Sequence, residues 1–152
     1  MKSSVKKVLL VDDDEDDSIV FRLALSELQA DIQFRWNNSC DNVVRELEQW
    51  KPDVVFLDIN LPRINGLECL AHIEKAAKLS HVPIIMYSCS ELPKDLQCSY
   101  ELGACLFFRK PSSLSQLTAA LADILQMNWH SPATIRQKFY SGGRCYEYTE
   151  AR

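Results

Sequence analysis

The stretch KKVLLVDDDEDD, residues 6–17, decides the fold of this chain. It joins a short run of Val and Leu, the composition of a strand covered on both faces, to an acidic segment. From Asp16 to about Leu28 the apolar residues recur at steps of three and four, which predicts a helix with Asp16 or Asp17 as its N-cap. A buried strand followed by a helix is the repeating unit of an α/β protein with a parallel sheet.

The same alternation of strand and helix continues along the chain. Further strands are predicted at 32–36, 53–57, 83–87 and 105–108, and further helices from a cap at Ser39 or Asp41 to Trp50, from Gly66 to Glu74, from Pro93 to Leu102, and from a cap at Ser112 or Ser113 to about Met127. Gly103 is expected to end the fourth helix in a left-handed conformation. Five buried strands alternating with five helices predict a parallel sheet with helices on both faces.

Charged residues stand directly after three of the predicted strands. Asp12 and Asp13 follow the first strand, Asp58 follows the third, and Lys110 closes the segment of the fifth. Because parallel strands end at one edge of a sheet, where open α/β folds bind ligands, these side chains are expected to converge. Carboxylates that close together cannot all stay ionised unless a cation joins them. The pattern therefore implies a divalent metal, with Lys110 binding an anion beside it.

Composition excludes several classes of protein. The 152 residues suit one ordinary domain with a tail, and the formal net charge of −4 gives no attraction to nucleic acid or to an anionic membrane. No apolar run approaches the roughly 20 residues that cross a bilayer, so a cytoplasmic protein is expected.

The six cysteines form no Cys-x-x-Cys pair and are predicted to be reduced, mostly core-filling thiols.

Residues 128–152 differ in composition from the chain before them, since Pro and Gly interrupt a mixture of aromatic and basic residues. We expect a domain at 1–127 and a C-terminal extension at 128–152 that is not a separate domain and is too short for a helix-turn-helix module. Two interpretations of the extension stay open: a strap that packs on the body or frays, and a dimer or partner contact carried by the aromatic residues.

The segments KKVLLVDDDEDD, DVVFLDINLPRINGLE, VPIIMYSCS and GACLFFRKP together resemble the receiver domain of two-component response regulators, over about residues 6–127. The resemblance implies a flavodoxin-like, doubly wound (βα)5 fold with strand order 2-1-3-4-5. It also implies a single-domain, chemotaxis-regulator-like protein. The SCS segment at 88–90 and the extension are similar to the small regulators that serve phytochrome-type kinases.

The resemblance assigns a role to each charged residue at the predicted edge. Asp58 is expected to accept a phosphoryl group from a phosphohistidine and to form an acyl phosphate. Mg²⁺ is the expected cofactor, held by Asp12, Asp13, Asp58 and the backbone carbonyl of Asn60. Lys110 is expected to pair with a phosphoryl oxygen.

Further roles follow for residues around this centre. Ser88 is expected to donate its hydroxyl to the phosphoryl group, and Phe107 stands where the family has its switch aromatic. Asn60 and Ser90 flank the route by which water would attack the acyl phosphate, and Cys89 narrows access to it. Because neither Asn60 nor Ser90 is an acid, slow self-dephosphorylation is expected.

Two rival classes are disfavoured by single residues. A phosphatase of the haloacid-dehalogenase type also uses an Asp nucleophile, Lys and Mg²⁺, but it needs a second Asp two residues later, where this chain has Asn60. A receiver-like module that binds without phosphorylation is expected to lack Asp13, Asp58 or Lys110, and all three are present. A phosphoacceptor with slow autodephosphorylation, rather than an enzyme, is therefore predicted.

The expected partners are proteins. A histidine kinase or phosphotransfer protein is expected to dock around the first predicted helix. A downstream target or a second copy is expected at the surface of the fourth helix, fifth strand and fifth helix, or at the extension. Neither nucleic acid nor a membrane is expected as a partner.

Overall fold

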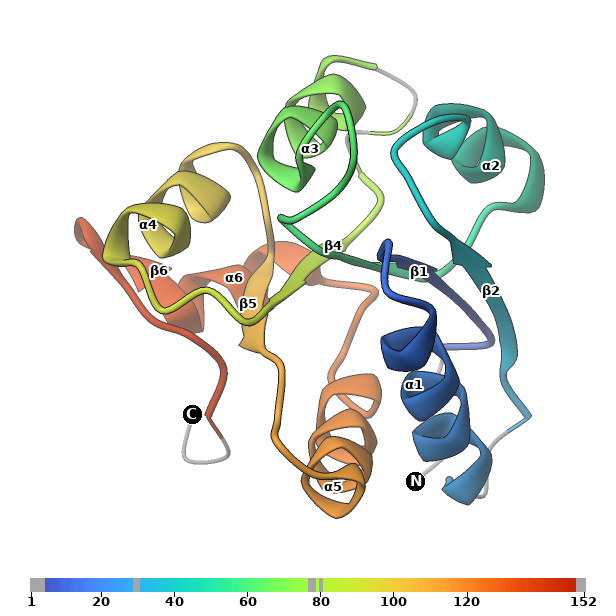
Figure 1. Cartoon of the computed structure of the whole chain (residues 1–152). Helices are drawn as coiled ribbons and strands as arrows, with labels where there is room; N and C mark the ends of the chain where they lie inside the picture. Colours follow the sequence, from blue (N-terminus) through green and yellow to red (C-terminus); the bar gives the residue numbers. More distant parts are fainter. Residues whose placement is uncertain (1–4, 29–30, 77–78, 80, 150–152) are drawn as a thin grey trace.

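The central element is a five-stranded parallel sheet with the order β2-β1-β3-β4-β5 (Figure 1). A computed structural model of the chain describes residues 5–28, 31–76, 79 and 81–149. The strands are β1 (Lys7–Val11), β2 (Gln33–Asn37), β3 (Val54–Leu57), β4 (Ile84–Ser88) and β5 (Leu106–Arg109). The predicted flavodoxin-like fold class and strand order are confirmed.

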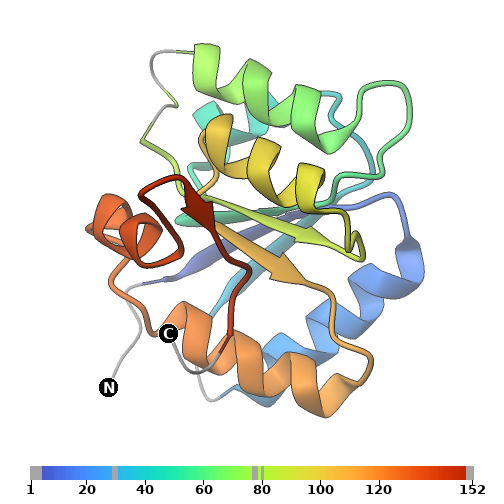
Figure 2. The ribbon, with the colours of Figure 1, turned by 90° about the vertical axis from the view of Figure 1, so that its left-hand side faces the viewer.

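Helices cover both faces of the sheet. They are α1 (Glu15–Glu27), α2 (Val43–Trp50), α3 (Gly66–Lys75), α4 (Pro93–Glu101) and α5 (Leu114–Leu125). Helices α1 and α5 lie together on one face, and α2, α3 and α4 lie on the other (Figures 1 and 2). Every residue of β3 and β4 is buried between these layers, as expected for central strands of a parallel sheet. In the part of the chain that is described, no helix is both long and apolar enough to cross a bilayer.

The helix caps differ in part from those predicted. Helix α1 is capped by Asp14, whose carboxylate accepts from the backbone N–H groups of Asp16 and Asp17. The prediction of Asp16 or Asp17 is wrong because a capping side chain must stand before the first turn whose N–H groups it satisfies. Helix α2 likewise begins after Asn42, which is left-handed and makes no side-chain cap. Ser113 does cap α5.

A disulfide corrects the prediction of reduced cysteines. Cys40, in the segment between β2 and α2, is bonded to Cys69 of α3, with 5.9 Å between their Cα atoms. The pair is 29 residues apart and belongs to no recognisable spacing motif, so its proximity arises from the packing of α2 and α3 on one face. Cys89, Cys98, Cys105 and Cys145 are free thiols.

The C-terminal extension packs against the body at the β5 edge of the sheet (Figure 2). It forms α6 (Pro132–Phe139) and a short hairpin of β6 (Tyr140–Ser141) and β7 (Arg144–Cys145). Phe139 is fully buried, and the N–H of Tyr148 donates to the carbonyl of Phe107 on β5 over 2.6 Å. The extension therefore covers an edge that would otherwise present unpaired backbone groups.

Tyr100 of α4 connects the extension to β5. Its buried hydroxyl donates to the carbonyl of Tyr146 (2.6 Å) and accepts from the N–H of Phe107 (3.0 Å). Its ring stacks on that of Tyr140, with 5.3 Å between ring centroids. Burial raises the pKa of the Tyr100 phenol, so the group remains a proton donor at neutral pH.

Replacing Tyr100 by Phe should lower the free energy of unfolding by about 1–2 kcal/mol, because the N–H of Phe107 and the carbonyl of Tyr146 lose a shared partner. Urea unfolding measures the change. Tyr140→Phe is the matched control, since the Tyr140 hydroxyl makes no hydrogen bond within the described residues and the ring stacking is kept. Equal effects of the two substitutions would contradict the bridging role.

Candidate functional site

The backbone of the sheet brings the predicted site residues to one edge. Strands β1 and β3 pair directly, and the N–H of Asp58 donates to the carbonyl of Val11 (2.9 Å), so Asp58 lies beside the end of β1. At the other end of the edge, the N–H of Lys110 donates to the carbonyl of Ser88 (3.0 Å). Asp12, Asp58, Ser88 and Lys110 are therefore placed by hydrogen bonds between neighbouring strands rather than by loop conformation.

The ammonium of Lys110 is the centre of the site. Its Nζ lies 2.8 Å from Asp12 Oδ2, 3.1 Å from Asp58 Oδ2 and 2.7 Å from Asp17 Oδ2. The Lys110 side chain is 8% exposed, and those of Asp12 and Asp58 are 0% and 5% exposed. The ring of Tyr87 flanks the ammonium, with 5.3 Å from Nζ to the ring centroid. One cation thus faces three carboxylates in a largely buried environment.

Burial and neighbouring charges have opposite effects on the pKa of Asp12 and on the pKa of Lys110. Burial raises the pKa of Asp12 from 3.8 to about 6, although the Lys110 ammonium and the N–H of Asp14 favour the ionised form. Burial opposes the charged form of Lys110 too, but its contacts with Asp12 and Asp17 outweigh burial and raise the pKa of the ammonium. Lys110 therefore stays protonated at neutral pH, and Asp12 is mostly ionised there but takes up a proton as the pH falls through about 6.

Asp12, Asp13 and Asp58 form an oxygen-rich group that fits a metal ion. One carboxylate oxygen from each lies within 4.8 Å of the others. Asp12 Oδ2 is fully buried and lacks a hydrogen-bond partner in the described part of the chain, because its contact with Lys110 has the distance of an ion pair but not the geometry of a hydrogen bond. A buried carboxylate oxygen that accepts no hydrogen bond, among other hard oxygen donors, suits a divalent cation such as Mg²⁺ or Mn²⁺.

Gly66 allows the segment after Asp58 to fold closely over the site. A Cβ atom at this position would lie 1.9 Å from the carbonyl oxygen of Asp58, which no side chain could tolerate. The N–H of Gly66 donates to the carbonyl of Ile59 (2.7 Å), and Asn65 caps α3 through the N–H of Glu68. The glycine is therefore required for the close approach of α3 to the backbone beside Asp58.

The remaining predicted site residues lie around this centre at different depths. Ser88 is fully buried, and its Oγ accepts from the N–H of Ser90 (3.2 Å). The hydroxyl of Ser90 donates to Asp95 at the start of α4 (2.6 Å). Asn60 and Cys89 are exposed. Phe107 is buried in β5, where its backbone contacts both Tyr100 and the extension.

Three residues at the site escaped the sequence analysis as functional residues. Asp17 was considered as a helix cap, yet its carboxylate reaches Lys110, 93 residues away. Tyr87 flanks the ammonium, and the indole N–H of Trp36 donates to the carbonyl of Asp12 (2.6 Å). Nothing in the sequence around Tyr87 or Trp36 indicates a functional role. For Asp17 the sequence offers one indication, because this residue lies about one helical turn after the acidic end of the first strand.

Replacing Asp12 by Asn should change how the stability of the metal-free protein depends on pH. Because the pKa of Asp12 is raised to about 6 by folding, the native state holds this proton more tightly than the unfolded chain. The tighter proton binding stabilises the native state fully below about pH 4, and this stabilisation is lost as the pH rises through about 6. Relative to wild type, Asp12→Asn should therefore gain roughly 2 kcal/mol of unfolding free energy between about pH 4 and pH 7.

Urea unfolding in a metal chelator at both pH values measures this difference. Asp16→Asn serves as the control, because Asp16 is exposed and lies outside the cluster. If the wild type and Asp12→Asn changed in parallel with pH, the raised pKa of Asp12 would be refuted.

Comparison with known proteins places these features in a family. The profile of the response regulator receiver domain matches residues 8–122. The sensory transduction protein BceR of Halalkalibacterium halodurans is 33% identical over 120 residues, covering 79% of this chain and 50% of that protein. A probable cyclic di-GMP phosphodiesterase of Vibrio cholerae is 27% identical over 133 residues, covering 88% of this chain and 30% of that protein. The chain thus spans half or less of the length of these curated relatives.

Solved structures share the fold over most of the chain. The Mn²⁺-bound response regulator Rcp1 aligns with a TM-score of 0.69 and 27% identity, covering 78% of this chain and 91% of that chain. The phosphorylated cyanobacterial phytochrome response regulator RcpA aligns with a TM-score of 0.70 and 27% identity, covering 80% of this chain and 91% of that chain. The response regulator domain of Thermotoga maritima CheB aligns with a TM-score of 0.69 and 25% identity, covering 83% of this chain and 97% of that chain. Because the family profile matches residues 8–122 and a relative is 33% identical over 79% of the chain, the chain belongs to the response regulator receiver domain family.

Proposed function

We propose that Asp58 accepts a phosphoryl group from a phosphohistidine of a histidine kinase or phosphotransfer protein. A carboxylate oxygen of Asp58 forms a bond to phosphorus, the P–N bond breaks, and its electron pair stays on the imidazole nitrogen. The product is an acyl phosphate. The observation that carries this proposal is the placement of Asp58 at the edge of the sheet, 3.1 Å from the Lys110 ammonium and within the acidic group.

Mg²⁺ is the cofactor that we propose, with Asp12, Asp13, Asp58 and the backbone carbonyl of Asn60 as its protein ligands. When bound, it would offset the negative charge that grows on the transferring phosphoryl group. Two findings support a divalent ion here: the carboxylate oxygens within 4.8 Å of one another, and the similarity to Rcp1, which is solved with Mn²⁺. The similarity to the phosphorylated RcpA supports phosphoryl transfer itself.

Lys110 and Ser88 are the proposed ligands of the phosphoryl oxygens. Lys110 is a protonated donor held in a buried position, so it can pair with an anion without a further ionisation step. Ser88 Oγ already accepts from Ser90 N–H, which leaves its own proton to be donated to the phosphoryl group. Ser88 and the loop after it would then move toward Asp58, and that displacement is the proposed conformational switch.

The surface of α1 is the proposed docking site for the phosphodonor. Ile19, Val20 and Leu23 are 50%, 38% and 49% exposed, unlike most large apolar side chains of the described residues. The same helix contributes Asp17 to the cluster around Lys110. A partner helix that covered the three apolar side chains would therefore bring its phosphohistidine to the acidic edge.

The signal output is proposed to involve the C-terminal extension. Phe107, the proposed switch aromatic, has its N–H bonded to Tyr100 and its carbonyl bonded to Tyr148. Arg109 of β5 also pairs with Glu147 (3.2 Å). A second copy or a downstream target would thus meet the surface of α4, β5 and α5 together with the extension.

We propose that residues 1–127 form the receiver domain, that residues 128–152 extend it, and that the protein acts in the cytoplasm.

Replacing Asp58 by Asn should abolish phosphoryl uptake. Incubation with acetyl phosphate and Mg²⁺ should add one phosphoryl group to the wild type, detected by intact mass, and none to Asp58→Asn, because an amide cannot act as the nucleophile. Asp16→Asn, exposed on α1, should behave like the wild type. Uptake by Asp58→Asn, or turnover of phosphate esters by the wild type, would refute the proposal.

Replacing Ser90 by Glu should speed the decay of the acyl phosphate, because a carboxylate at this position can orient the attacking water. One added hydrogen bond to that water corresponds to about fivefold in rate. The decay of phosphorylated wild type, Ser90→Glu and Ser90→Ala is followed by intact mass after removal of the donor. Ser90→Ala controls for the lost hydrogen bonds to Asp95 and Leu92. An unchanged rate in Ser90→Glu would count against a role for Ser90.

A further inference from the structure

The first turn of α1 brings a third carboxylate to Lys110, and the proposed phosphotransfer gives it no task. Asp17 Oδ2 lies 2.7 Å from Lys110 Nζ and accepts a hydrogen bond from it. We propose that Asp17 is a positioning residue: it holds the ammonium of Lys110 in place while Asp12 and Asp58 change partners during phosphorylation. The inference rests on the proposed function and concerns the same site.

The division of tasks among the three carboxylates carries this inference. Asp58 binds Lys110 less strongly once it is phosphorylated, because an acyl phosphate no longer carries the charge of the carboxylate. Asp12 belongs to the group that fits a metal ion, so its oxygens are also engaged elsewhere when the site is loaded. Asp17 lies outside that metal-binding group. It is therefore the member of the trio that can stay with Lys110 throughout the reaction.

The surroundings of Lys110 show what the ammonium would do without Asp17. Its side chain is 8% exposed, and the ring of Tyr87 flanks it, so it cannot relax fully into water. Asp12 and Asp58 would be its remaining carboxylate partners within 4 Å among the described residues. An ammonium drawn wholly onto these two would bind the Asp58 carboxylate more tightly and so make it a weaker nucleophile. Asp17 pulls Lys110 toward α1 and so leaves Asp58 freer to react.

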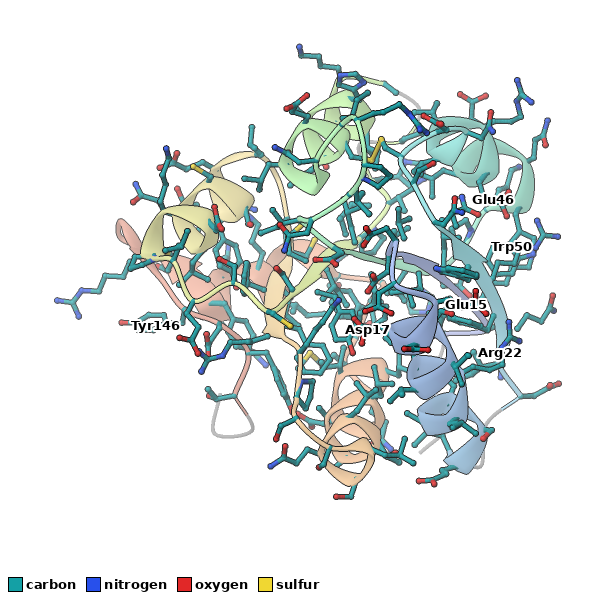
Figure 3. The ribbon with its side chains drawn as sticks, in the orientation of Figure 1. Glu15, Asp17, Arg22, Glu46, Trp50 and Tyr146 are labelled. Atoms are coloured by element: carbon teal, nitrogen blue, oxygen red, sulfur yellow. A yellow bond between two sulfur atoms is a disulfide. The ribbon has the colours of Figure 1, made fainter. Side chains whose placement is uncertain are left out.

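The side of α1 from which Asp17 projects agrees with this role. Figure 3 shows Asp17 at the N-terminal end of α1, directed toward the centre of the molecule. Its side chain is 37% exposed, so one part of the carboxylate faces solvent while Oδ2 faces the ammonium. In protein kinases, an ion pair with a glutamate of a neighbouring helix orients the phosphate-binding lysine in a comparable way.

The neighbouring Asp16 offers a matched control. Both residues stand in the first turn of α1, and the backbone N–H groups of both donate to the cap Asp14. Their carboxylates therefore have the same favourable interaction with the helix dipole. The side chain of Asp16 is exposed and forms no ion pair within the described residues. Asp16→Ala and Asp17→Ala thus remove the same charge and differ in the contact with Lys110.

The first test reads the ammonium itself in metal-free protein without any phosphodonor. The ¹⁵N signal of the Lys110 ammonium, assigned by its loss in Lys110→Arg, should be observable in the wild type and in Asp16→Ala because hydrogen bonds slow its proton exchange. In Asp17→Ala that signal should change its chemical shift, because the ammonium is then drawn onto Asp12 and Asp58. A signal at the same chemical shift in Asp17→Ala and the wild type would overturn the inference.

The second test compares phosphorylation rates with acetyl phosphate and Mg²⁺. Asp17→Ala should slow phosphoryl uptake by about two- to fivefold, the range expected for a partly exposed ion pair. Asp17→Asn, whose amide oxygen can still accept from Lys110, should be slowed less. In a Lys110→Ala background Asp17→Ala should have no further effect. If Asp16→Ala and Asp17→Ala both raised the rate, Asp17 would act by bulk charge and the inference would be wrong.

The two proposals fail in distinguishable ways. If the wild type takes up no phosphoryl group, or if Asp58→Asn still does, the proposed function fails, while the ammonium signal still reports on the contact between Asp17 and Lys110. If uptake requires Asp58 but proceeds equally fast in Asp17→Ala and the wild type, the positioning role alone is overturned. Urea unfolding of the Asp16 and Asp17 variants shows whether each is folded to the same extent.

Discussion

The burial of one ammonium among carboxylates is the interaction on which this site depends. Lys110 meets Asp12, Asp17 and Asp58 at distances of 2.7 to 3.1 Å, and its side chain is almost removed from solvent. Three carboxylates exceed the charge of one lysine, and Asp13 adds a fourth at the rim. The excess negative charge is unfavourable in a protein interior, and burial, with a smaller contribution from the charge of Asp58, raises the pKa of Asp12. The same imbalance is what makes a divalent cation and a transferred anion favourable at this edge.

The sheet holds this unfavourable arrangement in place. Asp58 and Lys110 are bonded through their backbone N–H groups to Val11 and Ser88, and the central strands β3 and β4 are buried throughout. Cooperative packing of the strands therefore opposes the repulsion at their ends. Gly66 adds a further constraint, because its missing side chain lets α3 close over the backbone of Asp58.

The C-terminal extension contacts β5, the strand that carries the proposed switch residue Phe107. Its backbone bonds to Phe107, the ring of Tyr140 stacks on Tyr100, and Tyr148 packs against Phe108 with 5.6 Å between ring centroids. Of the two interpretations open from the sequence, the structure shows the extension packed on the body. A movement of β5 would consequently be felt by the extension, and a partner that bound the extension would bias β5 in return.

Local patterns were enough to predict the five strands of the sheet, the five helices that cover it and the edge at which the charged residues gather, because buried-strand and helical patterns are local and parallel strands share one carboxyl edge. They did not predict α6 or the β6–β7 hairpin of the extension. The resemblance carried by four short segments gave the strand order. Tertiary structure alone decided the cap at Asp14, the disulfide between Cys40 and Cys69, the contact of Asp17 with Lys110 and the docking of the extension on Phe107. The last three join residues far apart along the chain, and the cap depends on how the chain turns from β1 into α1. No local pattern records the three long-range contacts, because they exist only once the layers have packed.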